Sequence, residues 1–179
     1  MKGLKIPTEV SSILKALDDA SFEAHIVGGC VRDLILGNAP KDWDVTTNAT
    51  PEKLQELFPD NFYDNAFGTV SVKTGSEDPT LAIIQITPYR IEGKYTDKRH
   101  PSEISFAKTL DEDLSRRDFT VNAIAMDASG QITDPHNGQE DIEKQVIRTV
   151  GNPDERFGED ALRILRAVRF SSSLGFTIE

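Results

Sequence analysis

The sequence is poor in cysteine and in long apolar runs. Cys30 is the single cysteine among 179 residues, which excludes an internal disulfide and argues against a cysteine-based zinc cluster. No apolar stretch approaches the length of a membrane-spanning helix, and the first residues do not have the pattern of a secretory signal. We therefore expect a cytoplasmic protein with no membrane partner.

Positive charge is also scarce. Lysine and arginine number 20 against 30 acidic residues, which gives a formal net charge of −10, whereas nucleic-acid-binding proteins generally present a basic surface. The basic residues are nevertheless grouped, at residues 94–100, at Arg116 and Arg117, and at Arg163, Arg166 and Arg169. Because local fields matter more than the total charge, a phosphate-bearing ligand is not excluded, although an extended RNA surface is expected to lie elsewhere.

The apolar pattern predicts helices and strands in one α+β fold. Residues 8–19 have the spacing of an amphipathic helix, and a second helix is expected to start near Pro51. Strands are expected at residues 26–27, 42–45, 62–63, 68–73, 81–87 and 146–150. Together they predict a mixed sheet of about five strands flanked by helices. A last helix is expected to begin at residues 152–154.

The segment 26–45 combines a glycine turn with a short helix. Gly28 and Gly29 follow the apolar strand and allow backbone N–H groups to approach an anion closely. A helix that starts at such a turn presents its N-terminus to a phosphate. Arg32, in the first turn, can add a charged fork of donors. The segment therefore predicts a phosphate-binding turn.

The same segment continues into an acidic pair. Asp42 and Asp44 are two residues apart, so in a strand their carboxylates point to the same face. Two neighbouring carboxylates raise each other's pKa, and a divalent cation removes that cost. Mg²⁺ is usually held by one or two carboxylates together with substrate phosphates. Either feature alone is common in ordinary turns and edges, but together they suggest phosphoryl chemistry on a nucleotide.

Two charged segments could complete the site. Arg116 and Arg117 directly precede an apolar segment, which would hold them at the edge of the core, where arginine can grip a triphosphate. Along the last helix, polar residues recur every third position, at Asp160, Arg163, Arg166 and Arg169. These four are either an ion-paired structural ladder or a surface that reads a base edge, because cytosine and adenine both place an amino group beside a ring acceptor.

The motifs resemble one known family. GGCVRD followed by DWD, then RRDFTVNA, then GEDALRILRAVRF occur in that order. They resemble the motifs of the class II tRNA nucleotidyltransferases and bacterial poly(A) polymerases, members of the polymerase β-like nucleotidyltransferase superfamily. The resemblance covers most of residues 24–175. It implies a catalytic head at residues 1–150 and the start of a helical neck at residues 151–179.

The resemblance also implies roles for individual residues. Asp42 and Asp44 would be catalytic and bind Mg²⁺. The nucleotide would be bound by Gly28, Gly29, Arg32, Arg117, Asp160, Arg163, Arg166 and Arg169. Among these, Arg117 would hold the phosphates or the sugar, with Asp118 and Asn122 orienting it, and Asp160 and Arg163 would contact the incoming base. Asp97 and Arg99 match a flexible-loop element that helps the family to switch between cytidine and adenosine.

Two departures from the family pattern are visible. Gln85 occupies the position where relatives often have a third carboxylate, and a neutral amide can neither act as a base nor offset a second Mg²⁺. Relatives also continue into a body and tail that hold the tRNA, and we expect that this chain lacks this RNA-holding part.

The resulting expectation is a template-independent nucleotidyltransferase. It would add CMP and/or AMP from CTP and ATP to the 3′ end of tRNA and release pyrophosphate. One rival is a poly(A) polymerase, which the shared motifs do not separate. The other is a nucleotide-binding head without independent catalytic activity, which Gln85 and the missing RNA-holding body slightly favour.

Overall fold

A computed structural model describes residues 5–64, 68–92 and 104–179. Asp97 and Arg99, expected in a functional loop, lie outside the described residues. The helices are α1 (Thr8–Asp19), α2 (Gly29–Ile35), α3 (Pro51–Leu57), α4 (Leu110–Ser115), α5 (Gly138–Lys144), α6 (Pro153–Glu159) and α7 (Leu162–Leu174), with a short 3₁₀ turn, η1, at Thr120–Asn122. None of the helices in these three ranges is long and apolar enough to cross a membrane.

The fold is built on a mixed sheet of seven strands in the order β3-β4-β5-β2-β1-β8-β9. These strands are β1 (Ala24–Val27), β2 (Asp44–Thr47), β3 (Asn61–Asp64), β4 (Thr69–Lys73), β5 (Ile83–Pro88), β8 (Ala125–Met126) and β9 (Ile132–Thr133). Within this sheet β2 and β5 are parallel, and the other neighbouring pairs are antiparallel. The α+β fold is therefore confirmed. The sheet is larger than the expected five strands because β8 and β9 are too short to show a period in the sequence.

Two small sheets complete the structure. β6 (Arg90–Glu92) pairs antiparallel with β7 (Ile104–Phe106), and β10 (Val146–Ile147) pairs in parallel with β11 (Thr177–Ile178). The strand expected at residues 146–150 is thus only two residues long. Its pairing with β11 joins the end of the described chain to the segment after α5.

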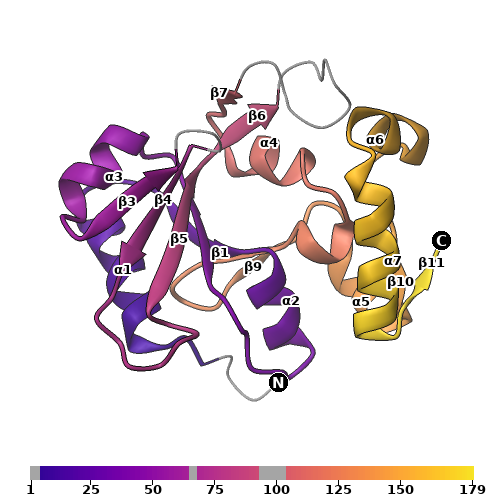
Figure 1. The fold of residues 1–179 in the computed structure, drawn as a ribbon, viewed down its shortest axis with the longest axis horizontal. Coiled ribbons are helices and arrows are strands. Elements are labelled where there is room, and N and C mark those ends of the chain that lie inside the picture. Colours follow the sequence, from indigo (N-terminus) through magenta and orange to yellow (C-terminus); the bar gives the residue numbers. More distant parts are fainter. Residues whose placement is uncertain (1–4, 65–67, 93–103) are drawn as a thin grey trace.

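The two faces of the main sheet differ in chemistry. On one face, Val45, Val70, Ile84 and Ile86 are buried in the core with residues of α1 and α3, and both helices lie on this side of the sheet in Figure 1. Because side chains alternate along a strand, the residues between these valines and isoleucines face the opposite side. That side carries polar groups, and α4 lies against it, where Asp113 accepts a hydrogen bond from Thr46.

The C-terminal segment is not one continuous helix. The chain forms α6 and then α7, with Asp160 between them in an extended conformation. Asp160 ends α6, and its carboxylate accepts a hydrogen bond from the backbone N–H of Leu162 at 2.9 Å. The prediction of a single helix from residues 152–154 onward was therefore wrong, since this local cap competes with helix continuation.

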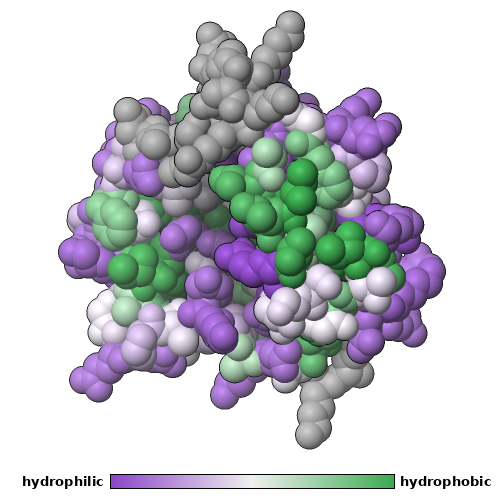
Figure 2. Space-filling view, turned by 45° about the vertical axis from the view of Figure 1, so that its right-hand side comes forward, coloured by the Kyte–Doolittle hydropathy of each residue, from purple (hydrophilic) through white to green (hydrophobic). Residues whose placement is uncertain are grey.

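Several apolar side chains of α7 are exposed rather than packed. Leu162, Ile164, Leu165 and Val168 are between 40% and 66% exposed. Figure 2 shows apolar residues gathered on the side of the molecule that carries the C-terminal helices. Within the described residues these side chains are therefore not covered by other parts of the protein.

Candidate active site

The polar face of the sheet forms the floor of an open cavity of about 660 Å³. Strand register places Asp44 beside Gln85, Gln85 beside Ser71, and Ser71 beside Phe62. Because directly paired residues share a face, these four side chains form a row across four strands. All four line the cavity, together with Asp42 at one end and Arg90, Arg116 and Arg117. The sheet therefore collects acidic and basic groups around a single space.

Asp42 and Asp44 both face this cavity, as expected from their spacing. Their backbone differs from the expectation, because β2 begins at Asp44 and Asp42 lies in the loop before it. Burial and the neighbouring negative charge of Asp42 raise the pKa of Asp44 to about 6, against the opposing effect of Arg117. A paired carboxylate whose charge is disfavoured in this way suits a divalent cation.

The donor set here consists of oxygen atoms, which are the ligands that Mg²⁺ prefers. No group of three or more His, Cys, Asp or Glu residues suited to a metal is found in the described parts of the chain. Asp42 and Asp44 would therefore be the protein's carboxylate ligands for an ion that substrate phosphates complete. The pair fits a hard divalent cation of this kind.

The glycine turn lies directly beneath Arg117. Gly28 has φ 82° and ψ −134°, a conformation that strongly favours glycine. A Cβ atom on Gly28 would lie 3.3 Å from Nη1 of Arg117. Gly29 begins α2, with Gly28 as its N-cap. The absence of a side chain at Gly28 therefore leaves room for the guanidinium group of Arg117. This is separate from the expected approach of the turn's backbone N–H groups to a phosphate.

Arg32 is buried and already engaged. Its Nη1 donates to Oδ1 of Asn122 at 2.6 Å, and its Nε and Nη2 donate to Oδ1 of Asp33 at 3.0 and 2.7 Å. The Nδ2 group of Asn122 lies 3.5 Å from Asp118 Oδ1, and Asp118 Oδ2 accepts from Arg166 Nε at 2.6 Å. A chain of polar contacts therefore joins α2 to α7, beside the cavity rather than in its wall.

The three arginines of α7 and Asp160, which lies between α6 and α7, do not share one environment. The guanidinium carbons of Arg166 and Arg169 lie 5.3 and 5.0 Å from the centre of the Phe170 ring. Arg163 is buried and donates to Glu159 Oε2 at 2.5 Å and to a backbone carbonyl of α6. Asp160 caps the start of α7. The regular ladder of four polar residues is therefore not formed, because Asp160 is outside the helix and Arg163 turns toward α6.

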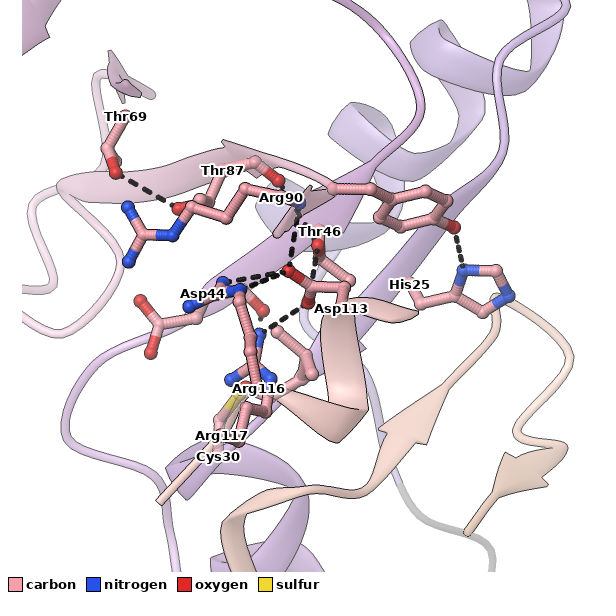
Figure 3. A network of polar contacts seen from close by, with 12 residues as sticks. His25, Cys30, Asp44, Thr46, Thr69, Thr87, Arg90, Asp113, Arg116 and Arg117 are labelled. Atoms are coloured by element: carbon pink, nitrogen blue, oxygen red, sulfur yellow. Dashed lines mark hydrogen bonds and ion pairs between the residues drawn. The ribbon is translucent and has the colours of Figure 1, made fainter. Parts of the chain in front are cut away.

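The sequence reasoning missed the buried acid that joins the two arginines of the cavity. Asp113, in α4, is fully buried and accepts hydrogen bonds from Arg116, Arg117 and Thr46, as Figure 3 shows. The available signal was spacing, because residues three and four apart on a helix are neighbours and Asp113 stands at those distances from Arg116 and Arg117. Arg90 was also missed as a cavity residue, whereas Arg116 lines the cavity beside Arg117, as their position before the apolar segment predicted.

Gln85 lies in the cavity floor next to Asp44, where the third carboxylate was expected in relatives. Its side chain is exposed to the cavity. Gln85 thus lies where a third carboxylate could join Asp42 and Asp44. Because its amide is neutral, this end of the cavity keeps these two carboxylates.

A family model described as "Poly A polymerase head domain" matches residues 24–148. The CCA-adding enzyme of Oceanobacillus iheyensis is 52% identical over 172 residues, which cover 96% of this chain and 42% of that protein. The CCA-adding enzyme of Lactobacillus helveticus is 50% identical over 168 residues, covering 93% of this chain and 41% of that protein. The chain thus spans about two fifths of the length of these relatives.

Solved structures give the same result. The Bacillus stearothermophilus CCA-adding enzyme in complex with CTP aligns with a TM-score of 0.85 and 41% identity, over 96% of this chain and 40% of that chain. The Thermotoga maritima CCA-adding enzyme complexed with tRNA aligns with a TM-score of 0.73 and 28% identity, over 98% of this chain and 40% of that chain. The resemblance expected from the motifs is confirmed, and the chain belongs to the poly(A) polymerase head-domain family that it shares with CCA-adding enzymes.

Proposed function

We propose that this chain is the catalytic head of a template-independent RNA nucleotidyltransferase, which adds CMP and/or AMP from CTP and ATP to the 3′ end of tRNA and releases pyrophosphate. The observation that carries the proposal is the acidic pair Asp42 and Asp44 in one cavity with Arg116 and Arg117. Relatives named CCA-adding enzymes support the choice of tRNA as the acceptor. Under this proposal the chain works in the cytoplasm, without a membrane partner.

The proposed reaction needs basic residues at the triphosphate and acidic residues at the attacking hydroxyl. The 3′-hydroxyl of the RNA gives up its proton to solvent as its oxygen forms a bond to the α-phosphorus, and the bond from that phosphorus to the bridging oxygen breaks, so that pyrophosphate leaves. Arg117 and Arg116 would bind the negatively charged triphosphate with bidentate donors. The turn at Gly28 and Gly29, with Arg32 behind it, would hold the nucleotide at the start of α2.

Asp42 and Asp44 would hold Mg²⁺ and position the attacking end of the RNA. A Mg²⁺ ion held by these two carboxylates would supply a lowered pKa for the 3′-hydroxyl and positive charge beside the reacting phosphate. The two carboxylates fix where the acceptor hydroxyl lies relative to Arg117. The arginines then hold the leaving pyrophosphate in line with the attack.

Recognition of the base is assigned to the residues near α7. Asp160 and Arg163 would pair with the amino group and ring acceptor of cytosine or adenine, with Arg166 and Arg169 close by. In the structure, Asp160 caps α7 and Arg163 contacts Glu159. Base binding by these two residues therefore requires them to exchange their present partners for the base. The division into a head at residues 1–150 and a neck from residue 151 remains part of this proposal.

The test is primer extension on a tRNA that lacks its 3′ end, with Mg²⁺ and each of the four nucleoside triphosphates separately and in combination. Extension by one to three residues, with C and A only, supports the proposal. Asp42→Ala should abolish extension, whereas Asp19→Ala, an exposed acid of α1, should leave it unchanged. Equal activity of the two variants would overturn the assignment of the acidic pair.

The same assay separates the two rival functions. Long tails made from ATP alone on unrelated RNA would identify a poly(A) polymerase. Binding of CTP and ATP without extension would identify a nucleotide-binding head. Extension would then be lost either because Gln85 replaces a carboxylate or because the RNA-holding part is missing. In that case Gln85→Glu distinguishes the causes, since regained extension would assign the defect to the missing carboxylate.

A further inference from the structure

Asp113 is a charged residue that no step of the proposed reaction uses. Its side chain is completely buried, although charged side chains are rarely buried unless they are paired. It lies in α4, between the cavity arginines and strand β2, at the centre of the network in Figure 3. Its position raises the question of what its charge does there.

The Asp113 carboxylate joins three parts of the chain. Its Oδ1 accepts from Nε and Nη2 of Arg116 at 2.9 and 2.7 Å. Its Oδ2 accepts from Nη2 of Arg117 at 3.0 Å and from Oγ1 of Thr46 at 3.2 Å. The backbone N–H of Arg90 lies 3.4 Å from Oδ1. Both oxygens are therefore saturated with donors.

These contacts keep the carboxylate ionised. Burial by itself would raise the pKa of Asp113, but the charges and hydrogen bonds of Arg117 and Arg116 hold that pKa below its usual value. A buried charge with matched partners strongly resists separation from them, because an unpaired charge in the interior is costly. The two guanidinium groups are consequently fixed relative to α4.

Thr46 extends this connection to the acidic pair. It is two residues after Asp44 on β2, and alternate residues share a face of the sheet. A single carboxylate thus holds both cavity arginines and touches the strand that carries Asp44. Nε of Arg117 is buried without a hydrogen-bond partner in the described structure, so this guanidinium retains a donor that Asp113 does not use.

We propose that Asp113 is a positioning residue for nucleotide binding, which holds Arg116 and Arg117 in the cavity wall at a fixed distance from Asp44. The inference rests on the proposed function, since it takes the triphosphate of an incoming nucleotide as the ligand of these arginines. In this role Asp113 does not touch the substrate. Its charge orients the donors that do.

The direct test replaces the carboxylate with an amide. Asp113→Asn retains the shape but presents an NH₂ group to donors that need an acceptor. We expect the Kd of CTP and ATP, measured by calorimetry in Mg²⁺, to rise about tenfold or more, the effect of one lost hydrogen bond to a charged group. The KM of the RNA primer should change less than twofold.

Asp141 supplies the matched control. It is also a buried carboxylate that pairs with one threonine, Thr120, at 2.6 Å and one arginine, Arg148, and it does not line the cavity. Asp141→Asn should lower stability while leaving the Kd of CTP and ATP within about twofold of the original. Equal changes in Kd for the Asp113 and Asp141 variants would overturn the inference and leave Asp113 with a structural role alone.

A milder pair of variants keeps the test decisive if Asp113→Asn does not fold. Thr46→Val removes one donor to Asp113, and Thr120→Val removes one donor to Asp141. We expect only Thr46→Val to weaken CTP and ATP binding, by about threefold or more, and no difference between the two would count against the inference. If the unaltered protein binds nucleotides but extends no primer, the proposed function fails while the binding comparison still decides the role of Asp113.

Discussion

Replacing Gly28 with alanine tests the structure where its backbone and its proposed chemistry meet. Gly28 connects β1 to α2 and has φ 82° and ψ −134°. An L-residue reaches this region only with strain. The added Cβ would also lie 3.3 Å from Arg117 Nη1 and 3.9 Å from the carbonyl oxygen of Asn122. The substitution therefore combines backbone strain with a contact that displaces a guanidinium group.

The expected magnitude follows from these two terms. Holding a non-glycine residue in a sparsely populated backbone region costs about 1–3 kcal/mol. The contact with Arg117 is with the tip of a flexible side chain, which can shift, so we expect it to disturb binding more than stability. For a chain of this size, each kcal/mol lowers the melting temperature by about 2–4 °C. Gly28→Ala should thus lower it by roughly 2–12 °C and raise the Kd of nucleoside triphosphates.

Two other glycines provide controls that separate the terms. Gly29 lies at the start of α2 without a positive φ, and its nearest neighbour for a new Cβ is Arg32 at an ordinary 3.6 Å. Gly29→Ala should therefore leave stability within about 0.5 kcal/mol. Gly37 has φ 76° but no atom within 4 Å of a new Cβ. Gly37→Ala should cost backbone strain without altering nucleotide affinity.

The assay is thermal and urea denaturation of the three variants, followed by calorimetric titration with CTP and ATP. We expect Gly28→Ala alone to lose both stability and affinity. If Gly28→Ala were as stable as Gly29→Ala, the assigned backbone conformation would be wrong. If its affinity matched that of Gly37→Ala, Arg117 would not be displaced by the new methyl group.

Two further predictions concern buried groups elsewhere in the structure. Burial raises the pKa of the Cys30 thiol from 9.0 to about 12, so its thiolate fraction at pH 8 should be about 1000-fold lower than in the unfolded chain. Alkylation of Cys30 should therefore be slow in buffer and fast in urea. Equal alkylation rates would refute the burial of this thiol. Arg163→Gln should destabilise the protein by about 1–3 kcal/mol, because a buried side chain loses its hydrogen bonds to the partly exposed Glu159 and to a backbone carbonyl of α6. Arg166→Gln should cost less, about 1 kcal/mol, because Arg166 is 43% exposed and its partner Asp118 keeps a hydrogen bond from the backbone N–H of Phe119; urea denaturation that gave the reverse order would contradict these placements.

Much of the fold was predictable because its signals are local. The helix at residues 8–19 was predicted with the bounds that α1 has, and α3 begins at Pro51, where a helix start was expected. These segments carry their own apolar period or turn chemistry. The two-residue strands β8 and β9 were missed because they are too short to show a period. β8 is defined by its pairing with β1, almost 100 residues away in the chain, and β9 pairs in turn with β8.

The sequence by itself determined which chemical groups this protein brings to its site. The order of the glycine turn, the acidic pair and the arginine pair identified the family, because each motif is short and its spacing is set by local backbone geometry. The tertiary structure decided which of these groups share a cavity. It placed Asp42, Asp44 and Arg117 together and engaged Arg163 with α6 instead.

The tertiary structure also shows that Asp113 is buried and that one of its hydrogen-bond partners, Thr46, is 67 residues away in the chain. Burial converts a common acidic residue of a helix into a fixed charge with saturated oxygens. Sequence spacing could suggest its two arginine neighbours, since these are local. Its contact with Thr46 of β2 forms only when the sheet folds against α4. The cost of burying its charge therefore depends on surroundings that the local sequence does not show.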